Sequence, residues 1–154
     1  MDALKALFSD FDLAAFLPDL DHFMGWVELG LRISVMAGPL LILFFGLLYL
    51  ISPPKEANHF LGFRFHWGMA SLDAWQFTQH WAGLIWSGLG VLLTIVMALI
   101  CNGFRRVDAM TMAWTAVGCL IAELILIGGS CVAVHVIVWR TFDRDGFRRD
   151  EEIE

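Results

Sequence analysis

The chain has 154 residues, of which 58% are hydrophobic and only 17% are charged. Its polar residues are too few to cover the surface of a soluble domain, and because no basic patch is present we expect no nucleic acid partner. Between the charged stretches lie three apolar segments, each about 20 residues or longer, which is the length that crosses a bilayer as an α-helix. The sequence therefore predicts an all-α integral membrane protein.

The N-terminal segment, residues 1–24, is predicted to form an amphipathic helix on the membrane surface. Leu4, Leu7 and Phe11 share one helical face, whereas Asp12 lies on another. Packing of this helix against the membrane domain is the alternative interpretation.

Residues 25–140 are predicted to form the membrane domain. Its second span carries Gly83 and Ser87 at a spacing that lets another helix approach closely in lipid. The neighbour could belong to this chain or to a second copy in a homo-oligomer. The predicted spans are residues 26–51, 81–101 and 109–139.

Three charged residues fall inside these spans. Arg32 follows Glu28 by four residues, so the two can pair on one helical face. Glu123 lies near the middle of the third span, where a carboxylate costs about 2.5–3.5 kcal/mol, so we expect it to face the bundle interior with a partner or to be protonated. Arg32 is the first partner to expect, and Thr94 is a weaker one.

Three cysteines lie in or at the ends of the spans, with an odd count and no CxxC spacing. This pattern predicts neither a disulfide framework nor a zinc site, and small packing residues are the ordinary interpretation. They are Cys101, Cys119 and Cys131.

The charges outside the spans predict a topology. Three spans place the N-terminus and the turn at 102–108 on one side, and the loop at 52–80 and the tail at 141–154 on the other. The first side has three Lys and Arg residues and the second has six, which predicts a cytoplasmic loop and C-terminus and an external N-terminus. The tail itself is charged, mixed in sign and predicted to be disordered.

The loop at 52–80 is too polar for hydrocarbon and unusually aromatic. Gly62 stands between apolar neighbours, which suggests a positive φ or a close backbone approach. Ser71 followed by Asp73 predicts a helix N-cap with an acid in the first turn, so that the helix runs through Trp75 into the second span. Trp67, Trp75 and Trp81 suit the headgroup layer of a membrane.

The loop resembles the signature of the SdpI family, bacterial membrane proteins named for immunity to a sporulation-delaying toxic peptide. Phe65-His66 stands where Thr-Pro is usual in that signature. The resemblance implies a non-enzymatic protein of the bacterial inner membrane that binds a toxic peptide or a regulatory protein through the bundle and the loop. The positions that carry it are Asn58, Gly62, Arg64, Trp67, Ser71, Asp73, Trp75 and Gly83.

Two other functions stay open at this point. A transport element could use Glu123 and Arg32 inside the membrane. A haem or metal site could form if histidines gather at one face of the membrane, although none of their spacings matches a ligand motif and we expect no resident cofactor or metal. An enzyme is not expected, because no Ser/His/Asp order, nucleophile elbow or phosphate loop is present. The histidines are His59, His66, His80 and His135.

Overall fold

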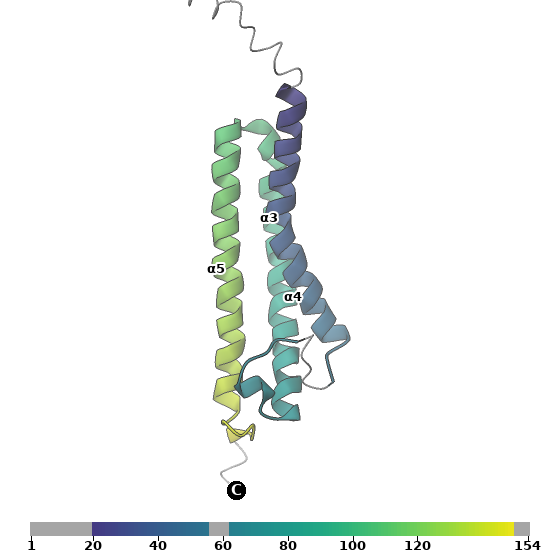
Figure 1. Cartoon of the computed structure of the whole chain (residues 1–154), viewed down its shortest axis with the longest axis vertical. Helices are drawn as coiled ribbons and strands as arrows, with labels where there is room; N and C mark the ends of the chain where they lie inside the picture. The colour runs from purple at the N-terminus through teal and green to yellow at the C-terminus, as the bar shows by residue number, and fades with distance from the viewer. Residues whose placement is uncertain (1–19, 56–61, 150–154) are drawn as a thin grey trace, which may run out of the picture.

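Three long helices, each lying beside the others, make up the computed structural model, which describes residues 20–55 and 62–149 (Figure 1). Each helix is long and apolar enough to cross a membrane. At 1.5 Å per residue the first helix is about 48 Å long, which exceeds the hydrocarbon core of about 30 Å. The prediction of an all-α protein with three spans is therefore confirmed. The helices are α3 (Leu20–Ile51), α4 (Leu72–Asn102) and α5 (Ala109–Thr141), and the short 3₁₀ turns are η1 (Trp67–Met69) and η2 (Phe104–Arg106).

One helix begins where the cap at Ser71 predicts, and another begins earlier than predicted. α4 begins at Leu72, nine residues before the predicted span, because Ser71 caps it at the loop. α3 begins at Leu20, so residues 20–24 belong to an apolar spanning helix and give no support to a separate surface helix. The rest of the predicted amphipathic helix, residues 1–19, lies outside the described residues.

Glycines set the close packing of α3 against α4. A Cβ on Gly90 would lie 2.6 Å from the Cα of Leu43, and a Cβ on Gly46 would overlap the backbone of Ser87. Gly83 faces α3 in the same way, with Leu50 3.0 Å from where its Cβ would lie. The small residues predicted to admit a neighbouring helix therefore contact α3 of this same chain.

The buried residues form two clusters, one near each end of the bundle. The cluster near the α4–α5 turn contains Cys101 and Cys119 as buried packing residues, and all three cysteines are free thiols. The cluster at the loop end contains Tyr49, Val138 and Phe142. Away from these clusters the helices present large apolar side chains outward, such as Leu124 at 74% exposure, so the bundle contacts lipid over most of its length.

Asp108 begins α5 at the turn. Its carboxylate accepts hydrogen bonds from the backbone N–H of Thr111, at 3.1 Å, and from the Thr111 hydroxyl, at 2.7 Å. These two bonds lower the pKa of the Asp108 carboxyl below its ordinary value. The capped turn fixes the antiparallel arrangement of α4 and α5.

Candidate functional site at the loop end and in the membrane

The loop at 52–80, which carries the family signature and which we call the motif loop, is folded around a buried tryptophan. Trp75 is fully buried, and its indole N–H donates to the carbonyl of Pro54 at 2.7 Å. Gly62 has φ of 116°, and a Cβ there would lie 2.6 Å from Cζ2 of the Trp75 ring. The positive φ expected at Gly62 is thus confirmed, whereas the headgroup position expected for Trp75 is wrong, because the ring fastens the loop to α4 from inside.

Gln79 holds the same loop one turn further along α4. Its amide is completely buried, accepts from the N–H of Phe63 at 2.8 Å and donates to the carbonyl of Phe63 at 3.0 Å. The side chain therefore supplies both backbone partners that a neighbouring strand would otherwise provide. Sequence reasoning missed this residue, although its spacing of four from Trp75 places both on one helical face.

η1 attaches the loop to α5. The ring of Phe65 packs on His135 with centroids 4.6 Å apart, and the ring of Trp67 meets His135 edge-on at 6.0 Å. Gly68 fits against Thr78, whose Oγ1 would lie 2.8 Å from a Cβ there. Phe65, one of the two residues that replace the usual Thr-Pro, therefore joins the loop to the third helix together with Trp67.

Arg64 lies on the outer side of this loop. Its side chain is exposed. The loop thus presents a cation at the surface while its aromatic neighbours point inward.

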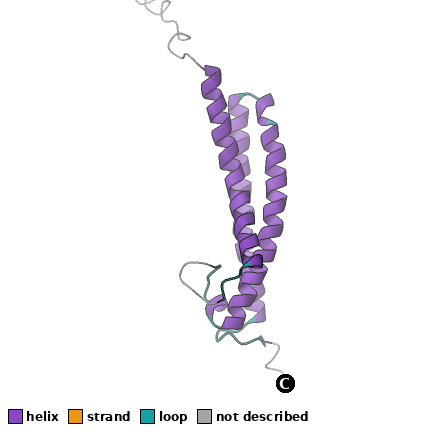
Figure 2. Cartoon of the chain, turned by 90° about the vertical axis from the view of Figure 1, so that its right-hand side faces the viewer, coloured by secondary structure: helices purple, strands orange, loops and turns teal. Residues whose placement is uncertain are grey.

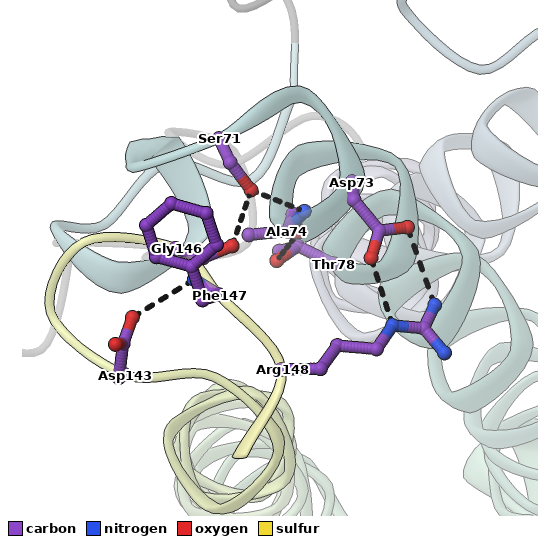
Figure 3. A network of polar contacts seen from close by, with 8 residues as sticks. All are labelled: Ser71, Asp73, Ala74, Thr78, Asp143, Gly146, Phe147 and Arg148. Atoms are coloured by element: carbon purple, nitrogen blue, oxygen red, sulfur yellow. Dashed lines mark hydrogen bonds and ion pairs between the residues drawn. The ribbon is translucent and has the colours of Figure 1, made fainter. Parts of the chain in front are cut away.

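The predicted helix cap at Ser71 is confirmed and has a second partner. Ser71 Oγ accepts from the N–H of Ala74 at 3.1 Å and donates to the carbonyl of Gly146 at 2.8 Å. The Arg148 guanidinium makes a bidentate ion pair with the Asp73 carboxylate: Nε donates to Oδ2 at 2.8 Å, and Nη2 donates to Oδ1 at 3.2 Å (Figure 3). Two motif residues are therefore bound by the C-terminal segment.

Residues 142–149 form a tight turn, which we call the C-terminal hairpin. Its backbone closes between Asp143 N–H and the Phe147 carbonyl at 2.9 Å, and Gly146 takes φ of 82°. The prediction of a disordered tail is wrong for these residues, while 150–154 lie outside the described part of the chain. Asp145-Gly146 is a dipeptide typical of tight turns and was the available signal.

Figures 1 and 2 show where the loop and the hairpin lie. Both are at one end of the bundle, and the α4–α5 turn is at the other. The predicted division of segments between two ends is therefore confirmed, and which end is cytoplasmic stays a prediction.

The charged residues of the spans are arranged differently from the expectation. Arg32 pairs with Glu28 at 2.6 Å, as predicted, and Arg105 reaches the same carboxylate at 3.4 Å. The expected pairing of Arg32 with Glu123 is wrong. Glu123 is only 3% exposed, and neither its Oε1 nor the hydroxyl of Thr94 has a hydrogen-bond partner within residues 20–55 and 62–149.

An apolar groove lies beside Glu123, between α3 and α5. Its volume is about 280 Å³, and its lining exposes no polar surface. Trp86 is one of its lining residues, and the indole N–H of Trp86 is buried without a hydrogen-bond partner among the described residues. The lining residues are Gly38, Leu41, Ile42, Phe45, Trp86, Ile127 and Cys131.

The histidines do not form a ligand set in the described ranges. His135 is packed between Phe65 and Trp67, whereas His80 borders a separate hollow beside Tyr49. In these ranges no three His, Cys, Asp or Glu residues gather closely enough to hold a metal ion. His59 lies outside the described residues, as does Asn58 of the motif.

A family model described as the SdpI/YfhL protein family matches residues 55–138, more than half of the chain. The chain belongs to the SdpI/YfhL family. The matched region contains the motif loop, α4 and most of α5, so the family's signature coincides with the contacts that join these three elements. No curated protein and no solved structure matches the chain.

Proposed function

We propose that this SdpI/YfhL family member is a non-enzymatic immunity protein of a bacterial inner membrane. It protects the cell by binding an apolar toxic peptide in the groove between α3 and α5, within the bilayer. Its family supports the immunity role. The observation that carries the binding site is the groove itself, whose lining is wholly apolar and is shared by residues of all three helices.

The groove suits a peptide better than it suits lipid tails. A buried N–H in hydrocarbon is costly unless an acceptor reaches it, and acyl chains carry none. A peptide brings apolar side chains that fill the groove as well as backbone carbonyls, which can accept from the Trp86 N–H when the indole turns toward the groove. Because the groove faces the hydrocarbon, a peptide already dissolved in the membrane reaches it directly.

The motif loop holds the helices that line the groove. Trp75 ties the exit of α3 to α4 through Pro54, and Phe65 ties the loop to α5 through His135. These two contacts lie at the loop end of the bundle. A shift of α3 or α5 at that end would change the distance between the two helices. With the loop in the cytoplasm, the exposed Arg64 is the motif residue best placed to report peptide binding to a regulatory protein.

A matched pair of substitutions on α5 tests this proposal. Ile127→Trp fills the groove, whereas Leu124→Trp makes a similar change on the outward face, which is 74% exposed. Toxin-sensitive bacteria expressing each variant would be challenged with the sporulation-delaying toxic peptide, with membrane levels of the protein measured in parallel. Protection is expected to be lost with Ile127→Trp and kept with Leu124→Trp. Equal protection by both variants would remove the groove from the proposal.

A further inference from the structure

Glu123 occupies a niche built by a glycine on the facing helix. A Cβ on Gly38 would lie 2.6 Å from Oε2 of Glu123, so any other residue at position 38 would displace the carboxyl group. The niche adjoins the apolar groove, because Gly38 and Ile127 border both. α3 thus makes room for a polar group in the middle of an apolar bundle.

The charged and titratable groups around this niche leave Glu123 without a counter-ion. On α3, Arg32 is engaged by Glu28 at 2.6 Å. On α4 and on α5 itself, the groups within electrostatic reach are the thiols of Cys101 and Cys119. No ion pair to Glu123 exists in the part of the chain that the structure describes.

The same stretch of α3 offers a hydrogen-bond acceptor. Pro39 lies inside the helix and has no N–H, so the carbonyl of Val35 lacks the donor that an uninterrupted helix supplies. An acid form of Glu123 has an O–H to donate, whereas a carboxylate has none. Burial of Glu123 without an ion pair therefore favours the protonated carboxyl, because protonation removes a charge from an apolar interior.

We propose that Glu123 is an intramembrane proton-binding site that holds a proton at neutral pH. The carboxylate takes up one proton to become the carboxylic acid, and the bound proton leaves again when the niche opens to water. This site is independent of peptide binding, because neither the groove nor the motif loop requires a titrating group.

The test uses the full chain in lipid vesicles and compares wild type with Glu123→Gln, which keeps the shape of the side chain. The infrared spectrum at neutral pH is expected to contain a carboxylic acid C=O band that is absent from Glu123→Gln. The apolar reagent dicyclohexylcarbodiimide, which adds to protonated carboxyls, is expected to label Glu123, and this labelling is expected to disappear at alkaline pH. Asp145→Asn, which changes an exposed acid of the C-terminal hairpin, is the control and is expected to keep both signals.

The infrared comparison decides the outcome. A wild-type spectrum at neutral pH that matches Glu123→Gln in the carboxylic acid region would overturn the proposal. A band that is present without labelling would support proton binding in a niche closed to the reagent.

Discussion

Truncation of Phe142 to alanine is expected to release the C-terminal hairpin from the motif. Phe142 is fully buried, its ring packs on Phe77 with centroids 5.3 Å apart, and the Arg148 guanidinium lies 5.7 Å from its centroid. Removing a buried phenylalanine side chain costs about 3–5 kcal/mol, because apolar burial is lost and a cavity remains. The ion pair between Arg148 and Asp73 is about half exposed and contributes only about 0.2–1 kcal/mol, so it cannot hold the hairpin alone.

Amide hydrogen exchange measures this release directly. The N–H groups of Asp143 and Phe147 are hydrogen-bonded within the hairpin. A loss of about 3 kcal/mol in local stability accelerates their exchange about a hundredfold, up to the limit of full exposure. The rest of α5 is expected to keep its protection, because it packs independently in the bundle.

Phe147→Ala is the matched control, since it makes the same chemical change in the same hairpin. Phe147 is 67% exposed, so its truncation is expected to change stability by less than about 0.5 kcal/mol. Equal exchange rates in the two variants would refute the reasoning that burial of Phe142 docks the hairpin.

Two further predictions concern the loop and the turn. Gln79→Leu is expected to destabilise the protein by about 1–3 kcal/mol, because it leaves the N–H and carbonyl of Phe63 buried without partners; thermal unfolding in detergent micelles checks this, and an unchanged midpoint would contradict it. The fold lowers the pKa of the Asp108 carboxyl. The ionised carboxylate therefore stabilises the fold above the ordinary pKa of about 3.9, and this stabilisation is lost as pH falls through the lowered pKa. Helix content followed by circular dichroism below pH 4 is expected to show less acid dependence in Asp108→Asn than in wild type.

The sequence was sufficient for features that depend on local chemistry. Apolar length predicted three spans, the spacing of Glu28 and Arg32 predicted their pair, and Ser71 predicted the cap of α4. Each of these follows from residues near one another in the chain.

Features that depend on contacts between distant residues could not be read in this way. Tryptophan is typical of the membrane interface, so the sequence suggests that position for Trp75. Its burial follows from the path of the loop, which places Gly62 and Pro54 against the ring. Charge alone suggested Arg32 as the partner of Glu123, but Glu28 lies one turn away and engages it first. The hairpin at Asp145-Gly146 had a local signal, although its docking on the α4 cap depends on tertiary structure.

Cross-linking at Cys131 tests the central claim, that the groove between α3 and α5 binds the peptide, most directly. Cys131 lines the groove, whereas Leu124 on the same helix faces outward. The sporulation-delaying toxic peptide, carrying a thiol-reactive group, would be added to membranes containing the chain with Cys101 and Cys119 replaced by alanine. The second sample would carry Cys131→Ser and Leu124→Cys in that same background. The account predicts an adduct at Cys131 and none at position 124, and equal adducts at both positions, or none at Cys131, would contradict it.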